Sequence, residues 1–394
     1  MNATDESPEG IQLSKKIFKR AGGILSLVLV AALILGLLQA YILRRNDKNQ
    51  LFVRGFYLEE EDSLDVVLIG ASEVYSDWYA ARAYQRGGFT SYPFSFESNP
   101  VTMWKYELRE ILKHQHPQIL VVEVSGAVYA DDKNLYGDGK IRKLSDNMPF
   151  SENKRDLVEN LGTQNKLSYY LPIIKYHDRW RQADEKHRDS DIRDLPTMKK
   201  RGHAVLRGAF SRTDIHRTKP EMDLTEDHSV KDLNPDAEAA LREFIGTCRD
   251  SGIEHVLFVE FPRQITSDRT YDRYQRYNRI AEIVREEGAD YAEFWSVREE
   301  IGLVKNVDYA DVDHLNARGA QKFTDYFCDW LMNKYALVPY PQSDKQKAEW
   351  EESARYVEAF CAAAEKQIQK DLPQETAQMM YEGVQPLQLV EAEL

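Results

Sequence analysis

Short apolar segments alternate with amphipathic segments along most of this chain. An apolar run of four to eight residues bounded by turn residues is typical of a strand buried on both faces of a parallel sheet. Apolar residues spaced three or four positions apart instead form one face of a helix. Strands that alternate with helices predict an α/β fold, a doubly wound, three-layer α/β/α domain with a parallel sheet. The expected strands span residues 65–69, 89–96, 118–124, 255–261 and 291–295, and the expected helices span 78–86, 101–113, 237–251 and 274–287, with a last helix that ends at Met332.

Residues 24–43 form an apolar run without a charged side chain. Twenty helical residues reach about 30 Å, the thickness of the hydrocarbon core of a bilayer, so this run predicts one transmembrane helix. A cleaved secretory signal fits less well, because its apolar part is usually about 7–15 residues long and this run ends in a poor cleavage site. The small excess of basic residues before the run favours a cytoplasmic amino terminus, which places most of the chain outside the cytoplasmic membrane. The basic residues are Lys15, Lys16, Lys19 and Arg20 before the run and Arg44, Arg45 and Lys48 after it.

The composition fits a large folded domain attached to this helix. About 350 residues follow the run, enough for one α/β domain with insertions. The formal net charge of −13 argues against a nucleic-acid partner, because phosphate binding needs clustered Lys and Arg. Cys248, Cys328 and Cys361 are far apart and lack Cys-x-x-Cys spacing. They predict neither a disulfide framework nor a zinc site, and we expect no metal and no cofactor.

These features divide the chain into a cytoplasmic segment (1–23), the transmembrane helix (24–43), an α/β domain (50–340) and a helical, acidic carboxyl-terminal tail (345–394). The strand–helix alternation stops between about residues 130 and 236, where the sequence is charged and contains scattered Tyr and Pro. A segment this long is too large for a simple connection. It is either an inserted subdomain or lid that binds a substrate or partner, or a solvated helical excursion without a chemical role. The tail predicts one or two amphipathic helices.

Ser72 is the first candidate for a reactive side chain. It follows the expected strand 65–69 and the turn residues Gly70 and Ala71. Open α/β sheets bind their ligands at the carboxyl ends of the strands, which is where this serine lies. A serine in such a turn also serves well as a helix N-cap, and that interpretation needs no catalytic role.

His314 and two neighbouring acids, Asp311 and Asp313, are the second candidate group. They lie in a loop directly before the last expected helix. A histidine oriented by a carboxylate is the usual base for a serine nucleophile. The same residue types also bind metals, but the sequence around them shows no further cluster with metal-ligand spacing.

The two groups together, Gly70-Ala71-Ser72 after the first strand and Asp311-x-x-His314 before the last helix, resemble the SGNH (GDSL-like) hydrolase family. The similarity is closest to a membrane-anchored branch of bacterial cell-surface proteins that includes the D-alanyl-teichoic-acid transfer protein D and the alginate O-acetylation proteins. Residues 313–323, Asp-His-Leu-Asn-x-x-Gly-Ala-x-x-Phe, are characteristic of relatives in Gram-positive bacteria. The resemblance covers about residues 65–328, implies a flavodoxin-like sheet, and is more specific for the fold than for the substrate.

The resemblance implies a catalytic triad. Ser72 would attack an acyl carbonyl, His314 would take its proton, and Asp311 would orient the imidazole, with Asp313 as the alternative acid. The resulting acyl-enzyme would pass its acyl group to a sugar, polyol or polymer hydroxyl, or to water.

The chain departs from the family at the oxyanion hole. Hydrolytic members use a Gly after the second strand and an Asn after the third, together with the N–H of the nucleophilic serine. Here the second position falls within residues 97–99, so Ser72 and Asn99 are the candidate donors, and the third strand ends without the Gly-x-Asn-Asp pattern. Because one missing donor typically lowers the rate about 10²–10³-fold, an impaired hydrolase or a transferase is compatible with this sequence.

Three functions follow from the resemblance. The first is an extracytoplasmic O-acyltransferase that modifies a cell-wall or exported glycopolymer, such as a teichoic acid, and receives its acyl group through a polytopic membrane acyltransferase. The second is a surface carbohydrate esterase that removes acyl groups. The third is a binding or scaffold protein that keeps the fold and lacks turnover.

Overall fold

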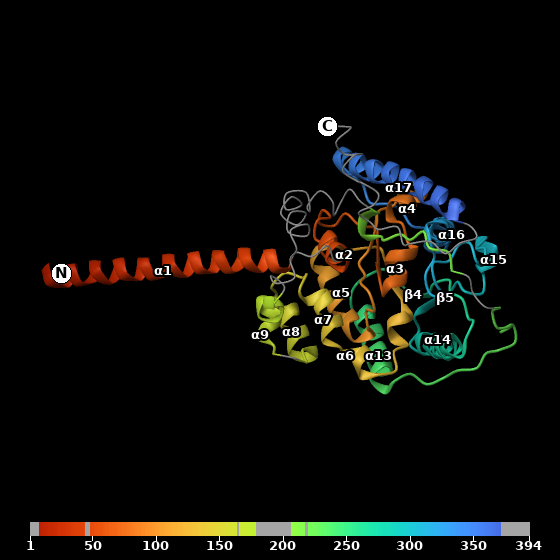
Figure 1. The fold of residues 1–394 in the computed structure, drawn as a ribbon, viewed down its shortest axis with the longest axis horizontal. Coiled ribbons are helices and arrows are strands. Elements are labelled where there is room, and N and C mark those ends of the chain that lie inside the picture. The colour runs from red at the N-terminus through yellow and green to blue at the C-terminus, as the bar shows by residue number, and fades with distance from the viewer. Residues whose placement is uncertain (1–7, 44–47, 164, 179–205, 217–219, 372–394) are drawn as a thin grey trace.

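The computed structural model describes residues 8–43, 48–163, 165–178, 206–216 and 220–371. Its first helix, α1 (Pro8–Leu43), extends away from the rest of the chain as one long rod (Figure 1). Within α1, Ile17–Leu38 is long and apolar enough to cross a membrane, and none of that stretch is buried against the protein. This stretch overlaps the predicted transmembrane segment 24–43, so the structure is consistent with a membrane-spanning helix near the amino terminus.

The sheet contains five parallel strands in the order β2-β1-β3-β4-β5. Strands β1 and β3 are wholly buried, as expected for apolar central strands of a parallel sheet. The strands are β1 (Val66–Ile69), β2 (Ser91–Pro93), β3 (Ile119–Glu123), β4 (His255–Glu260) and β5 (Asp290–Glu293). The α/β class and the parallel sheet predicted from the sequence are therefore confirmed, although β2 is shorter than the predicted segment 89–96.

The register aligns the carboxyl ends of the central strands. Ile69 at the end of β1 lies opposite Val122 of β3, and Glu123 of β3 lies opposite Val259 of β4. The strand order reverses at β1, which has β2 on one side and β3 on the other. In doubly wound sheets of this order, ligands bind at this switch point.

Two groups of helices pack around the sheet. One group consists of α3, α4, α16 and α17, which contact one another. Another consists of α5, α13 and α14, where α5 contacts β1 and α14 contacts β5. The helices of these two groups are α3 (Ser72–Asp77), α4 (Ala80–Gly87), α5 (Trp104–His114), α13 (Pro235–Arg249), α14 (Asp268–Glu286), α16 (Ala317–Tyr335) and α17 (Asp344–Asp371). Further helical segments are α2 (Lys48–Phe56), α15 (Arg298–Ile301) and the 3₁₀ turns η1 (Val101–Met103) and η2 (Val124–Ala127).

The first helix after β1 begins earlier than predicted. A helix was expected from Trp78, but α3 already begins at Ser72, and the chain breaks between α3 and α4 at Trp78 and Tyr79. At this break the backbone N–H of Tyr79 donates to the hydroxyl of Thr324 in α16. A contact 245 residues away in sequence cannot be read from local periodicity.

The described residues of the segment without strand pattern include short helices and an irregular stretch. These helices are α6 (Asp132–Tyr136), α7 (Asp138–Ser145), α8 (Glu152–Leu161), α9 (Leu167–Tyr170) and α10 (Ile173–Tyr176), and η4 (Leu206–Gly208) follows later. In the tail, α17 packs against α4 and α16 and buries Trp350, Phe360 and Ile368. The acidic end of the tail, residues 372–394, lies outside the described residues.

Candidate active site

A sharp turn carries the chain from β1 to Ser72. Gly70 has φ +147°, and a Cβ at this position would lie 2.7 Å from Cγ2 of Val74 and 2.8 Å from Cβ of Glu123. Only glycine fits both the backbone conformation and the space. The turn places Ser72 in the first turn of α3, with Ala71 as the N-cap residue, so the hydroxyl of Ser72 does not occupy the capping position.

The structure brings together Ser72, His314 and Asp311. Oγ of Ser72 lies 2.7 Å from Nε2 of His314. Nδ1 of the same ring lies 2.7 Å and 2.9 Å from the two carboxylate oxygens of Asp311. With a proton on Nδ1, the ring donates to Asp311 and accepts from the hydroxyl of Ser72, which is the arrangement a serine nucleophile needs.

The loop that carries His314 is held by its own hydrogen bonds. Oδ1 of Asp311 accepts from the backbone N–H groups of Asp313 and His314 at 2.9 Å and 3.0 Å. The N–H of Leu315 donates to Asp77 of α3 at 3.0 Å. Asn316 then caps α16 by accepting from the N–H groups of its first turn. The pair is therefore attached both to the helix that starts with Ser72 and to α16.

The charges around this pair shift both pKa values. Burial raises the pKa of Asp311, but its hydrogen bond and attraction to His314, together with the Arg212 guanidinium, outweigh burial and hold the pKa well below its usual range. Burial lowers the pKa of His314, whereas the bond and charge of Asp311 and the charge of Glu73 raise it, so the pKa ends above the ordinary value of 6.5. Arg212 opposes that rise.

Asp313, the alternative acid, binds arginines instead of His314. Its carboxylate accepts from Nη1 of Arg273 at 2.6 Å and lies 4.0 Å from Nη1 of Arg263. Burial raises the pKa of Asp313, but the charges of these two arginines lower it below the usual value. Among the described residues, no group of three or more His, Cys, Asp or Glu is arranged to hold a metal ion.

Three charged residues near the triad were not singled out from the sequence: Glu73, Arg273 and Arg212. Oγ of Ser72 also lies 3.4 Å from a carboxylate oxygen of Glu73, which is itself 3.7 Å from Arg273 of α14. Arg212 donates to Asp311 at 2.7 Å. Glu73 was visible as the neighbour of Ser72, but the two arginines belong to a helix and an irregular segment that carry no local signal of proximity.

The side-chain amide of Asn99 is engaged inside the protein. Its nitrogen donates to the carbonyl oxygen of Gly70 at 3.0 Å and to the carboxylate of Glu107 at 2.8–2.9 Å. An amide has two hydrogens, so none is left for an oxyanion. Asn99 instead supports the turn before Ser72, and only its backbone N–H stays a candidate donor.

The buried carboxyl group of Glu123 lies at the end of β3, the strand next to β1. Glu123, the last residue of β3, accepts from the N–H and the hydroxyl of Ser125 at 3.0 Å and 2.6 Å. Burial, with the charge of Glu73, raises the pKa of Glu123 to about 8. Gly126 follows, and a Cβ there would lie 2.2 Å from the carbonyl oxygen of Asn99. The two strand ends thus approach too closely for a larger residue.

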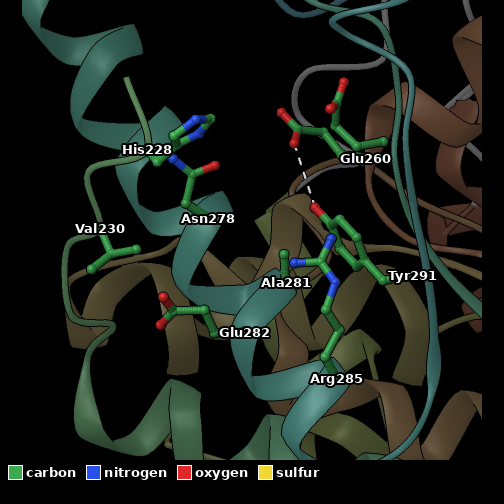
Figure 2. Close-up of a pocket in the computed structure, with 9 residues that line it drawn as sticks. His228, Val230, Glu260, Asn278, Ala281, Glu282, Arg285 and Tyr291 are labelled. Atoms are coloured by element: carbon green, nitrogen blue, oxygen red, sulfur yellow. Dashed lines mark hydrogen bonds between the residues drawn. The ribbon is translucent and has the colours of Figure 1, made fainter. Parts of the chain in front are cut away.

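A separate cavity of about 260 Å³ lies beside β4, β5 and α14 (Figure 2). In Figure 2 the Tyr291 hydroxyl points toward Glu260, at 3.5 Å, and the Arg285 guanidinium lies over the Tyr291 ring. Burial raises the pKa of Glu260 to about 7 although Arg263 opposes this. Arg263 also donates to Glu260 at 2.7 Å, so the cavity wall connects with the arginines around Asp313. The residues that line the cavity come from elements other than those that carry Ser72 and His314.

No protein-family model matches this sequence, and a search of the curated proteins finds no similar one.

Proposed function

We propose that this chain is a membrane-anchored serine acyltransferase or esterase of the SGNH type. The observation that carries the proposal is the continuous hydrogen-bond path from Oγ of Ser72 through His314 to Asp311. A serine that only capped a helix would accept from backbone N–H groups of that helix. In α3 the N-cap position is occupied by Ala71, and the hydroxyl of Ser72 contacts the imidazole instead.

The proposed reaction proceeds in two steps. In the first, Nε2 of His314 takes the hydroxyl proton of Ser72 while Oγ bonds to the carbonyl carbon of an acyl donor, and the protonated His314 returns the proton to the leaving group. In the second, a hydroxyl of an acceptor or a water molecule gives its proton to His314 and attacks the acyl carbon, the bond between that carbon and Oγ of Ser72 breaks, and His314 returns the proton to Oγ. Asp311 keeps the proton on Nδ1 of His314 and stabilises the imidazolium that forms.

The developing oxyanion needs N–H donors. The first N–H groups of a helix have no partner within that helix, so the N–H of Ser72 is one proposed donor, with the backbone N–H of Asn99 as the second. A hole built from two backbone donors lacks the side-chain amide of the hydrolytic family.

The proposal also includes the location of the protein and its partners. α1 would span the cytoplasmic membrane, and the α/β domain, folded as a doubly wound, three-layer sandwich, would lie outside it. The strand order and the position of Ser72 at the switch point support this fold. An acyl group delivered by a polytopic membrane acyltransferase would pass through Ser72 to a hydroxyl of a cell-wall or exported glycopolymer. If water accepts it instead, the protein is a surface esterase.

One observation favours a second function, binding without turnover. The residues after β3 are Val124, Ser125 and Gly126 instead of the pattern with the Asn that the hydrolytic family uses, and the side-chain amide of Asn99 is engaged inside the protein. A scaffold protein would keep the fold and tolerate this loss.

The reactivity of Ser72 should depend on the protonation of His314. Because His314 must be neutral to accept the proton, the rate of Ser72 modification by a serine-directed fluorophosphonate should rise with pH through the pKa of His314. That pKa is raised, so the half-maximal rate should fall on the alkaline side of pH 6.5. The measurement is the modification rate from pH 5 to pH 9. A rate that is flat across this range would contradict the assignment of His314 as the base.

An adduct experiment tests the proposal directly. The full chain in detergent is incubated with the fluorophosphonate and analysed by intact mass and peptide mapping. We expect one adduct at Ser72 in the unaltered protein and none in Ser72→Ala. Ser76→Ala is a matched control, since Ser76 lies one turn later in the same helix and should not affect labelling. A folded protein without an adduct would favour binding without turnover.

A further inference from the structure

The irregular stretch at the end of the insertion lies within the folded core. We name residues 206–216 the strap. Most of its side chains are buried, including Arg207, Phe210 and Thr213. Unlike a solvated loop, it contacts α2, α4, β2 and α17 through η4.

The strap is fixed to the two elements that carry the candidate triad. The N–H of Phe210 donates to the carbonyl oxygen of Tyr75 in α3 at 2.7 Å, and Tyr79 donates a short hydrogen bond to Ser211. On the other side, the side-chain amide of Asn316 donates to the carbonyl oxygen of Asp214 at 3.1 Å. The strap therefore joins the helix that begins at Ser72 to the residue that caps α16.

The side chain of Arg212 contacts the loop that carries Asp311 and His314, and its main chain contacts the start of α16. Its guanidinium donates to Oδ2 of Asp311 at 2.7 Å, while its carbonyl oxygen accepts from the N–H of Ala317 at 2.8 Å. Oδ1 of Asp311 is already held by three donors from the loop itself. Arg212 thus provides a donor to the second oxygen, which also lies 2.9 Å from Nδ1 of His314, so both carboxylate oxygens are engaged.

We infer that the strap is a positioning element of the candidate active site and that Arg212 is the positioning residue that keeps Asp311 directed at His314. The inference rests on the proposed function, and it assigns a role to the part of the insertion whose role the sequence left open. Arg212 acts through Asp311 and His314. In the structure it donates to the carboxylate and not to Ser72.

The test compares two variants in the same strap. Arg212→Met keeps the approximate length of the side chain and removes the charge, and Ser211→Ala removes an uncharged contact of the strap to Tyr79. Two quantities are measured on the full chain in detergent: the fluorophosphonate rate at Ser72, and the titration of the His314 ring by NMR with labelled histidine, assigned with His314→Gln.

For Arg212→Met we expect the labelling rate to fall about 10- to 100-fold, as is usual when an orienting contact is lost. Asp311 raises the pKa of His314 through its hydrogen bond and its charge, whereas the charge of Arg212 lowers it. If Arg212 positions Asp311, its removal should weaken the contact between Asp311 and His314 and move the His314 titration to lower pH. Loss of the Arg212 charge alone would move the titration to higher pH. Arg212→Lys, which keeps a charged donor, should restore the titration. The charged and titratable groups around the Asp311–His314 pair are Glu73, Tyr75 and Asp77 from α3, Arg212 and Asp214 from the strap, Arg263, Arg273 from α14, and Asp313 from the loop.

The two measurements separate failure of this inference from failure of the proposed function. If Ser72 does not react in any form, the NMR titration still tests the contact. The inference is overturned if Arg212→Met leaves the titration unchanged or moves it to higher pH, or if Ser211→Ala moves it equally far. If Arg212→Met does not fold, Arg212→Leu, which also removes the donor and the charge, should show the same downward shift, and an unshifted titration would overturn the inference.

Discussion

Replacing His314 with glutamine should lower the rate of fluorophosphonate modification at Ser72 by about 10⁴-fold or more, as is typical when one member of a catalytic triad is removed. The imidazole is the group in contact with Oγ of Ser72, at 2.7 Å. Glutamine can still hydrogen-bond to the hydroxyl but cannot take its proton at neutral pH. The measurement is a time course of labelling by intact mass for the full chain.

His255→Gln is the matched control for this prediction. His255 begins β4 and stacks on Tyr335 with ring centroids 4.6 Å apart, so it lies at the opposite end of the strands from Ser72. Its replacement should leave the labelling rate within about twofold, because it touches none of the triad residues named above. Equal rates for His314→Gln and the unaltered protein would show that the imidazole does not activate Ser72, whatever its position.

Much of the position of Ser72 and Asp311–His314 could be predicted from the sequence. The apolar run before Gly70 is typical of a buried strand, and a parallel sheet places the carboxyl ends of its strands at one edge. Asp311 and His314 lie three residues apart directly before a helix. A pattern this short can be recognised in the sequence without knowledge of long-range contacts. The strand order, by contrast, came from pairing over long distances, which the sequence pattern does not specify.

The supporting residues could not be predicted because their contacts are non-local. Arg212 lies 99 residues from Asp311 in sequence, within a segment that has no periodic pattern. Asn99 was a candidate oxyanion donor because it follows the second strand, but Glu107 and Gly70 occupy its side-chain amide. The sequence identifies a polar side chain near a site, but it does not show which groups accept hydrogen bonds from that side chain.

Replacing Glu59 with alanine should lower the free energy of unfolding by about 3–5 kcal/mol, because removal of one partner leaves the other charge buried without compensation. The carboxylate of Glu59 accepts from Arg207 at 2.6 Å and 2.8 Å, and the two side chains are 3% and 1% exposed. Arg207 would keep only its bond to Ser353 and its contact with the Trp350 ring, both in α17. The measurement is urea unfolding of the full chain in detergent, followed by tryptophan fluorescence.

The neighbouring residue provides the control for this last prediction. Glu60 pairs with Lys345, whose side chain is 72% exposed, so Glu60→Ala should leave the unfolding midpoint unchanged, as is common for surface ion pairs. The double variant Glu59→Leu with Arg207→Met removes both charges and should recover much of the loss.

Because Arg207 precedes Arg212 in the strap, Glu59→Ala should also slow labelling of Ser72, whereas Glu60→Ala should not. Equal stability of the two single variants would mean that α17 alone holds Arg207, and that the tail, rather than the turn after α2, anchors the strap.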